Sequence, residues 1–239
     1  MKIALIGYGK MGKAIEEIAL ERGHEIVLRI HSRNIETFTE ANIQQADVCI
    51  EFSTPESAFQ HVATCLQASV PVVCGSTAWL EQLPEAEAIC RQHQTAFLYA
   101  SNFSVGVNLF FRINKMVAAL MGKHPEYRVS MEEIHHTQKK DAPSGTAVSL
   151  AEGILAEIPA LHHWVNEESQ QPNILPIVSK RIDPAPGTHT IQYDSDIDSI
   201  CLTHTAHSRK GFALGAVLAA EFICGKQGIF TMEDVLQLG

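Results

Sequence analysis

A glycine-rich loop near the start of the chain constrains the fold most strongly. Residues 2–6 form a short apolar run, and the loop Gly7-Tyr8-Gly9-Lys10-Met11-Gly12 joins them to a helical pattern over residues 10–22. In a G-x-G-x-x-G loop the first glycine permits a tight turn, the second lets a pyrophosphate approach the backbone, and the third lets helix and strand pack closely. The helix N-terminus adds free N–H groups and a positive dipole end. The loop predicts a dinucleotide site, although a tight turn without a ligand is the alternative.

Strands and helices alternate along the first hundred residues. Further strands are predicted at residues 25–30, 47–52, 70–75 and 96–100, with helices at 56–68 and 80–93. This alternation predicts a parallel sheet with right-handed crossovers. The glycine loop stands at the start of this alternating pattern, and this position favours cofactor binding over a turn without a ligand.

The pattern changes after about residue 102. Helices are predicted at 106–122, 146–158 and 212–224, and strands at 127–136, 174–182, 188–194 and 197–206. Strands with few helices between them are typical of an α+β domain with a mixed or antiparallel sheet. We therefore expect an α/β chain in which a Rossmann-like parallel-sheet domain is followed by an α+β domain.

Composition excludes several classes of protein. The net charge of −9 argues against a nucleic-acid partner, although Arg209 and Lys210 could hold a small anion. No run approaches the ~20 apolar residues of a membrane span. The six cysteines are scattered without a C-x-x-C pair, which indicates reduced thiols and a cytoplasmic location.

The end of the second predicted strand bears on the choice of cofactor. A carboxylate usually stands there to hold the ribose 2′-hydroxyl, but this chain has His31, Ser32 and Arg33. Arginine matches phosphate geometrically, so we predict that NADPH is used at least as well as NADH. The alternative is that Arg33 is a solvated surface residue.

Two later strand ends are expected to line the same cofactor, because ligands of open α/β sheets bind at the carboxyl ends of the strands. Taken alone, each is an ordinary loop. They are Gly75-Ser76-Thr77 and Ala100-Ser101-Asn102-Phe103.

The densest group of polar side chains lies in the segment 133–146. Strand alternation places Glu133 and His135 on one face and Ile134 and His136 on the other. A histidine at a strand end suits general acid catalysis near neutral pH. Adjacent histidines on a strand point apart and chelate poorly, so we predict no metal site.

Two lysines and a hydroxyl-rich turn complete this segment. Lys139 and Lys140 form a cationic patch that can hold a carboxylate or donate a proton, and residues 141–146 form a turn into a helix. The N-terminus of that helix is expected to bind an anion through Ser144, Gly145 and Thr146. Each residue alone is better explained as a surface residue or helix cap, but the set favours function.

This segment closely resembles the signature of the 4-hydroxy-tetrahydrodipicolinate reductase family, long called dihydrodipicolinate reductase, of bacterial lysine and diaminopimelate synthesis. The shared string is H-H-x-x-K-x-D-A-P-S-G-T, from His135 to Thr146. The resemblance spans nearly the whole chain. It includes the loop Gly7–Gly12, Gly75-Ser76-Thr77, the run 102–108, and Ser208-Arg209 followed by Phe212-Ala213.

The resemblance implies a division of labour along the chain. Residues 1–103 and 214–239 would bind the dinucleotide, and residues 104–213 would bind a small dicarboxylate and form a homotetramer. His135 would be the general acid/base and Lys139 a proton donor. The groups that hold the carboxylates would be His136, Lys139, Ser144, Gly145 and Thr146, and the cofactor contacts would be Gly7 to Gly12, Gly75 to Thr77 and Ala100 to Phe103.

Departures from the family pattern are local. Many members have Glu or Asp at the position of His31, which puts an NADH preference in doubt. Many also have Gly-Thr-Thr-Gly where this chain has Gly75-Ser76-Thr77-Ala78, and Thr137 replaces a common Arg or Asn. Two other functions remain open: a different two-domain Rossmann reductase, and a catalytically silent dinucleotide sensor.

Overall fold

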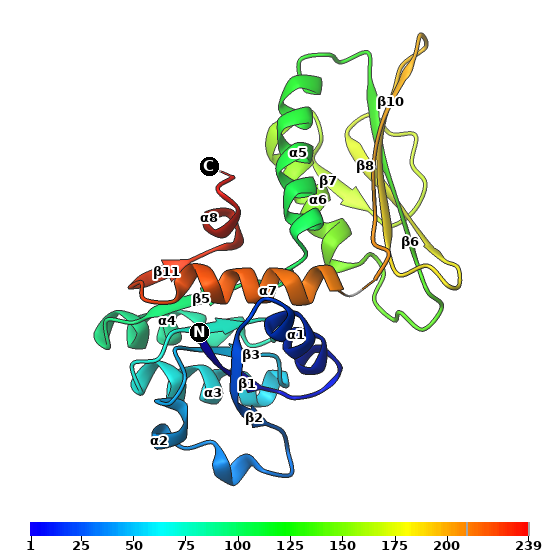
Figure 1. Ribbon diagram of the computed structural model, residues 1–239. Coiled ribbons are helices and arrows are strands. Elements are labelled where there is room, and N and C mark those ends of the chain that lie inside the picture. The colour runs from blue at the N-terminus through cyan, green and yellow to red at the C-terminus, as the bar shows by residue number, and fades with distance from the viewer. Residues whose placement is uncertain (209, 239) are drawn as a thin grey trace. The chain divides into compact units, whose positions relative to one another are not determined.

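The computed structural model describes residues 1–208 and 210–238 and divides into two compact units (Figure 1). The first comprises residues 1–105 together with the described C-terminal residues 210–238, and the second comprises residues 106–208. No helix among the described residues is long and apolar enough to span a membrane.

The first unit is built on a six-stranded sheet in the order β11-β5-β4-β3-β1-β2, with every adjacent pair parallel. The parallel sheet predicted from the alternating pattern is therefore confirmed. The sixth strand, β11, was not predicted. The strands are β1 (Lys2–Ile6), β2 (Glu25–Ile30), β3 (Val48–Glu51), β4 (Val72–Cys74), β5 (Ala96–Tyr99) and β11 (Gly228–Phe230).

Helices cover both faces of this sheet, and each face has its own apolar core. Helices α1 (Lys10–Glu21) and α7 (Lys210–Ile223) pack in one core with α8 (Met232–Leu236), and α3 (Pro55–Gln67) and α4 (Leu83–Gln92) pack in the other. Alternation along β1 divides its residues between the two: Ile3 and Leu5 enter the first core, and Ala4 and Ile6 the second. The weakly patterned crossover at 34–46 contains only a 3₁₀ turn (Ile35–Thr37) and the short helix α2 (Glu40–Ile43).

Close packing of α7 fixes the loop that follows β5. A β-carbon at Gly215 would lie 1.7 Å from the carbonyl oxygen of Phe103, so only glycine lets the helix approach this backbone. Helix α7 thereby helps to form one of the loops predicted to contact the cofactor.

The second unit contains a five-stranded mixed sheet in the order β10-β9-β6-β8-β7. Strand β6 pairs parallel with β8 and antiparallel with β9, so the mixed alternative of the prediction is correct. The short strand β7 was not predicted. The strands are β6 (Arg128–His135), β7 (His163–Val165), β8 (Ile174–Arg181), β9 (Thr188–Asp194) and β10 (Ser199–Thr205).

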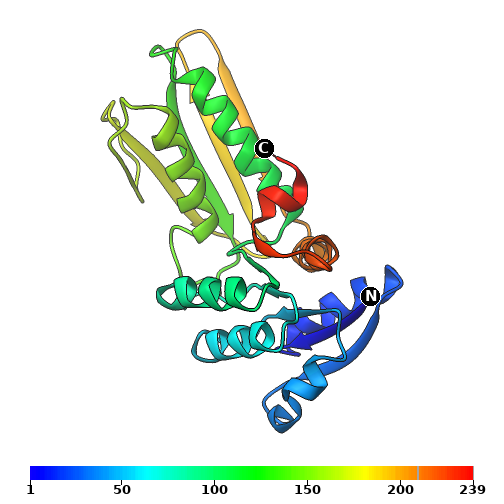
Figure 2. The same ribbon diagram turned by 90° about the vertical axis from the view of Figure 1, so that its left-hand side faces the viewer.

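Helices α5 (Val105–Met121) and α6 (Gly145–Glu157) lie on one face of this sheet (Figure 2). Their apolar residues meet every second residue of β6 and β9 in a single core. The opposite face carries no helix from the described residues 106–208. One face of β6 is therefore buried, and this face carries Glu133 and His135.

Candidate functional site

The three glycines of the first loop have the three environments that the motif requires. Gly7 has φ +91°, and a β-carbon there would lie 2.1 Å from the carbonyl oxygen of Phe52. A β-carbon at Gly12 would lie 2.7 Å from the carbonyl oxygen of Gly7, whereas one at Gly9 would meet nothing within 4 Å. The loop thus leaves open space above its middle glycine, at the start of α1, where a pyrophosphate can approach.

The residues predicted to read the ribose are exposed at the end of β2. The backbone N–H of His31 donates to Asn34 Oδ1 at 2.8 Å, and the N–H of Arg33 donates to His31 Nδ1 at 3.0 Å. The Arg33 side chain forms no hydrogen bond or ion pair with the described residues, while Arg29 is bound to Glu16 on α1. The guanidinium of Arg33 is therefore available for an anionic ligand.

Two further loops lie at the carboxyl ends of the adjacent strands β4 and β5. In the first, Ser76 is buried and its hydroxyl forms no well-aligned hydrogen bond with the described residues, while its carbonyl accepts the indole N–H of Trp79 at 2.7 Å. A buried hydroxyl without a partner is costly, so a ligand or water is expected to meet it. Ala78 has φ +63°, a conformation that favours glycine, which explains the glycine usual at this position.

A buried carboxylate that the sequence did not predict supports these loops. Glu51, at the end of β3, is fully buried and accepts hydrogen bonds from the N–H of Ser53 at 2.9 Å and the thiol of Cys74 at 3.1 Å. Burial opposes ionisation, but hydrogen bonds with His61, Ser53 and Cys74 outweigh it and lower the pKa of Glu51. The carboxylate thus connects the loop that follows β3 to the end of β4.

The second candidate site lies at the carboxyl end of β6. Glu133 and His135 are buried, and Ile134 and His136 on the opposite face are partly exposed, so the predicted alternation is confirmed. The opposite orientations of His135 and His136 also exclude a shared chelate.

Glu133 is the centre of this site. Its two oxygens each accept the backbone N–H of Ser144 at 3.1 Å, and Oε1 lies 3.2 Å from Nη2 of Arg181. Oε2 lies 3.3 Å from Nδ1 of His135 and 3.7 Å from Nε2 of His189. Glu133 and His135 therefore form an ion-pair contact, because Nδ1 of His135 lacks the alignment of a full hydrogen bond to Oε2.

The protonation states in this cluster follow from burial and neighbouring charge. Burial alone would raise the pKa of Glu133, but the adjacent imidazole of His135 and the hydrogen bonds from Ser144 hold it well below its usual range. Burial lowers the pKa of His189 to about 4, with repulsion from His135 acting in the same direction and attraction to Glu133 opposing it. At neutral pH, Glu133 is therefore ionised and His189 is uncharged.

The lysine loop is anchored by Arg181 of β8. Its Nη2 donates to the carbonyl of Asp141 at 2.5 Å, and its Nε donates to the carbonyl of Lys139 at 3.3 Å. The Lys139 ammonium donates to the Asp141 carboxylate at 2.9 Å. The lysine is thus held beside the cluster with a carboxylate as its partner.

The turn at the start of α6 separates into buried and exposed parts. Ser144 is buried and caps the helix: its Oγ accepts the N–H of Ala147 at 3.2 Å and lies 3.1 Å from Nε2 of His189. Gly145 is exposed, with open space where a β-carbon would stand, and Thr146 is partly exposed. The first helical turn therefore presents Gly145 and Thr146 outward, while Ser144 bonds within the fold.

Glu133, His135 and His189 also form a group whose possible metal ligands lie within 4.8 Å of one another. Both Glu133 oxygens already accept N–H bonds from Ser144, however, and one faces the Arg181 guanidinium. Because a metal ion would have to displace these donors, the geometry favours a protein-only network.

In the second site, the residues that the sequence did not reveal are Arg181 and His189. They lie 46 and 54 positions after His135 and reach it through the sheet, where Arg181 is the register partner of His135 and His189 that of Glu133. The sequence did offer one indication of them: Glu133 occupies a core-facing position of β6, and a buried carboxylate requires a buried partner. Arg209, predicted as part of an anion site, lies outside the described residues.

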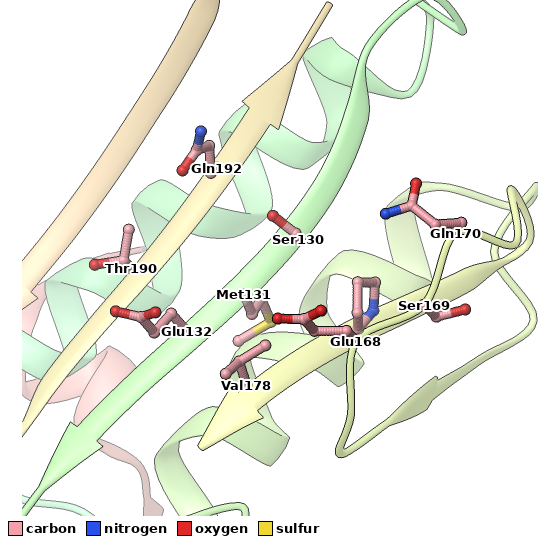
Figure 3. Close-up of a pocket in the computed structure, with 10 residues that line it drawn as sticks. Ser130, Met131, Glu132, Glu168, Ser169, Gln170, Val178, Thr190 and Gln192 are labelled. Carbon is pink, nitrogen blue, oxygen red and sulfur yellow. The ribbon is translucent and has the colours of Figure 1, made fainter. Parts of the chain in front are cut away.

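A cavity of about 240 Å³ lies on the open face of the second sheet (Figure 3). Ser130 and Glu132 of β6 and Thr190 and Gln192 of β9 line it, together with Glu168. These strand residues face away from the core that contains Glu133 and His135. The cavity is thus separate from the polar cluster.

Comparison with known proteins covers nearly the whole chain. Residues 1–103 match the family described as dihydrodipicolinate reductase, N-terminus, and residues 106–236 match dihydrodipicolinate reductase, C-terminus. A 4-hydroxy-tetrahydrodipicolinate reductase of Christiangramia forsetii is 50% identical over 99% of this chain and 98% of its own length. The enzyme of the same name from Neisseria meningitidis serogroup C is 33% identical over 93% of this chain and 84% of its own length.

A solved structure confirms the fold. The dipicolinate-bound dihydrodipicolinate reductase of Paenisporosarcina sp. TG-14 superimposes with a TM-score of 0.79 at 23% identity, over 97% of each chain. At this identity the similarity establishes the architecture, an α/β unit followed by a mixed-sheet unit.

Proposed function

The chain belongs to the dihydrodipicolinate reductase family, and from this premise we propose that it reduces 4-hydroxy-tetrahydrodipicolinate to tetrahydrodipicolinate and water in lysine and diaminopimelate synthesis. The 50% identity to a reductase of this name, over essentially both full lengths, carries the proposal. The buried Glu133–His135 cluster and the exposed helix turn beside it supply the chemistry that such a reduction needs.

A bound nicotinamide would supply a hydride to the ring carbon conjugated with the imine that forms when the hydroxylated substrate loses water. His135 then donates a proton to the resulting enamine, and Lys139 assists beside it. The contacts proposed for the two substrate carboxylates are His136, Lys139, Ser144, Gly145 and Thr146. Gly145 and Thr146 are the most accessible of the turn residues, so we assign the direct contact to them and the shaping of the turn to Ser144.

The first unit has a pyridine-nucleotide-binding fold, and its cofactor is NADPH or NADH. We propose that the glycine loop holds the pyrophosphate, because Gly9 leaves space for it. The loops Gly75–Thr77 and Ala100–Phe103 would line the nicotinamide side. Exposed Arg33 and the absence of a carboxylate at the end of β2 favour NADPH.

The domain roles and the assembly are further parts of this proposal. Residues 1–103 and 214–239 would bind the cofactor, and residues 104–213 the substrate. The open face of the second sheet would join subunits into a homotetramer. The cavity on that face supports an interface there. All six cysteines are free thiols, which supports a cytoplasmic location.

One assay tests the reaction and separates it from the alternatives. NADPH absorbance is followed in the presence of the condensation product of aspartate semialdehyde and pyruvate. Oxidation that depends on this product supports the proposal. Binding of NADPH without oxidation by any cyclic imine dicarboxylate would identify a dinucleotide sensor. Oxidation only by other imines or carbonyl compounds would identify a different reductase.

A further inference from the structure

Glu133 is a fully buried carboxylate at the meeting point of β6, β8, β9 and the start of α6. No part of the proposed reaction uses it directly. An ionised group in such a place is costly to maintain unless its neighbours compensate for the lost water. The groups around it are Arg181, His135, His189 and the backbone of Ser144, and the imidazole of His135 is the one assigned to chemistry.

We propose that Glu133 is a positioning residue that holds a proton on Nδ1 of His135 and so directs proton exchange with the substrate through Nε2. This inference rests on the proposed role of His135 as the acid. The inference names Nε2 as the atom of His135 that exchanges the proton, and Glu133 as the residue that determines the tautomer.

The orientation of the His135 ring supports this assignment. Nδ1 is buried and lies 3.3 Å from Oε2 of Glu133, and no other described residue offers it a hydrogen bond. A carboxylate accepts and cannot donate, so the proton between the two groups belongs to Nδ1 in both charge states of the imidazole. When His135 is neutral, Nε2 is then a base, and when it is charged, the Nε2 proton is the one that leaves.

The proton balance of the step follows. The N–H bond at Nε2 breaks as a C–H bond forms on the enamine carbon, and the imidazolium becomes neutral with its Nδ1 proton retained. Glu133 stays ionised throughout and stabilises the imidazolium before the transfer. Solvent returns a proton to Nε2 after product release.

The same carboxylate links the acid to the rest of the site. It accepts the N–H of Ser144, which sets the start of α6, and it pairs with Arg181, which holds the carbonyls of Lys139 and Asp141. A displacement of Glu133 would therefore disturb the acid, the lysine and the anion-binding turn together. Uncharged His189 fills the space beside the imidazole, with ring centroids 5.1 Å apart, and does not compete for the carboxylate as a cation.

A purely structural role for Glu133, as the partner of Arg181 and Ser144, is the main alternative. The two roles differ in the tautomer of His135, which ¹⁵N NMR of histidine-labelled protein reads without substrate. Comparison with His135→Ala assigns the signals. In the unmodified protein the neutral form of His135 is expected to carry its proton on Nδ1, and a proton on Nε2 would overturn the proposal whatever the activity.

Glu133→Gln tests the carboxylate while keeping the side-chain volume and an acceptor for Ser144. We expect loss of the Nδ1–H preference and a decrease in kcat of roughly 10- to 100-fold, as when a carboxylate that orients a functional histidine is removed. The KM for NADPH should stay unchanged. Retention of the tautomer, or of kcat within about twofold of the unmodified enzyme in a variant that folds, contradicts the role.

Glu126→Gln is the matched control. Glu126 stands two residues from His124, and its Oε1 lies 3.2 Å from Nδ1 of that histidine, but both side chains are 57% exposed. The substitution Glu126→Gln should leave kcat and the His135 tautomer unchanged. If Glu133→Gln fails to fold, the tautomer in the unmodified protein still decides the question. If the unmodified protein reduces no dicarboxylate imine, the proposed function fails, and the tautomer result still stands.

Discussion

A β-carbon at Gly187 would lie 3.1 Å from Nε2 of His135. Gly187 is buried in the turn before β9, and its missing side chain leaves the outward nitrogen of the imidazole uncrowded. Because Nε2 is the atom assigned to proton transfer, this space is part of the site.

Gly187→Ala is therefore expected to lower kcat by about tenfold, since displacements of an ångström or less are enough to impair catalysis. The KM for NADPH should not change, because the substitution touches only the acid. Steady-state kinetics measure both. Pro186→Ala, an exposed change in the same turn, is the control, and an unaltered kcat in Gly187→Ala would mean that Nε2 is not the reactive atom.

Removal of the acid itself should have a larger effect. His135→Ala is expected to lower kcat by roughly 10²- to 10⁴-fold, the usual contribution of general acid catalysis. The affinity for NADPH, measured by fluorescence titration, should be preserved because the loop that holds the cofactor is unchanged. His135→Gln separates lost chemistry from a cavity, since it fills the same buried space. Near-normal turnover in both variants would refute the assignment.

The glycine loop offers a pair of substitutions with opposite expected results. Gly9→Ala places a methyl group in open space, so the melting temperature should be unchanged while the Kd for NADPH rises by about tenfold as the methyl obstructs the phosphates. Gly12→Ala brings a methyl group to 2.7 Å from the Gly7 carbonyl oxygen and should lower the free energy of unfolding by about 1–3 kcal/mol. Calorimetry and cofactor titration distinguish the two. Equal effects of both variants on cofactor affinity, with no loss of stability, would contradict this reading.

Cofactor preference is expected to depend on Arg33. Its guanidinium is exposed and makes no ion pair with the described residues, so it can contact a 2′-phosphate. Arg33→Ala should therefore lower kcat/KM for NADPH by roughly tenfold and leave the value for NADH unchanged. Arg91→Ala, which removes an exposed arginine paired with Glu87, is the control. A parallel loss with both cofactors would show that Arg33 does not read the phosphate.

Much of the fold follows from sequence periodicity, because the long strands and helices have strong apolar patterns. The predicted elements agree with the observed bounds within about two residues. The exceptions include α4, which begins three residues after its predicted start, and the unpredicted elements α2, β7 and β11. The two strands have three residues each and exist only because a neighbouring strand pairs with them. Segments this short carry too little periodicity to be recognised.

The site shows a similar division. The segment 133–146 is contiguous, so its polar character and alternation were readable. Arg181 and His189 come from two other strands, and their place beside His135 depends on sheet register, which a single sequence does not specify. The bonds of Ser144 within the fold depend in turn on Glu133, whose burial becomes clear only once α6 covers β6.

Stability should depend on pH through His189. Burial lowers its pKa from 6.5 to about 4 in the folded protein, so between these values the unfolded chain binds a proton that the folded chain does not. The free energy of unfolding is therefore highest above pH 6.5 and decreases as the pH falls toward 4, by about 2 kcal/mol between pH 7 and pH 5. The charged or titratable groups that act on this histidine are Glu133, His135, Lys139 and His204.

His189→Gln removes the titrating group and should flatten this part of the pH dependence. Amide hydrogen exchange along β9 gives the free energy of opening at each pH and so measures the pH dependence for the second unit alone. His163→Gln changes an exposed histidine and should retain the full decrease. If the opening free energy of the unmodified protein is the same at pH 7 and pH 5, His189 is protonated in the fold. Glu133 would then be shared between two cations, which would weaken its hold on His135.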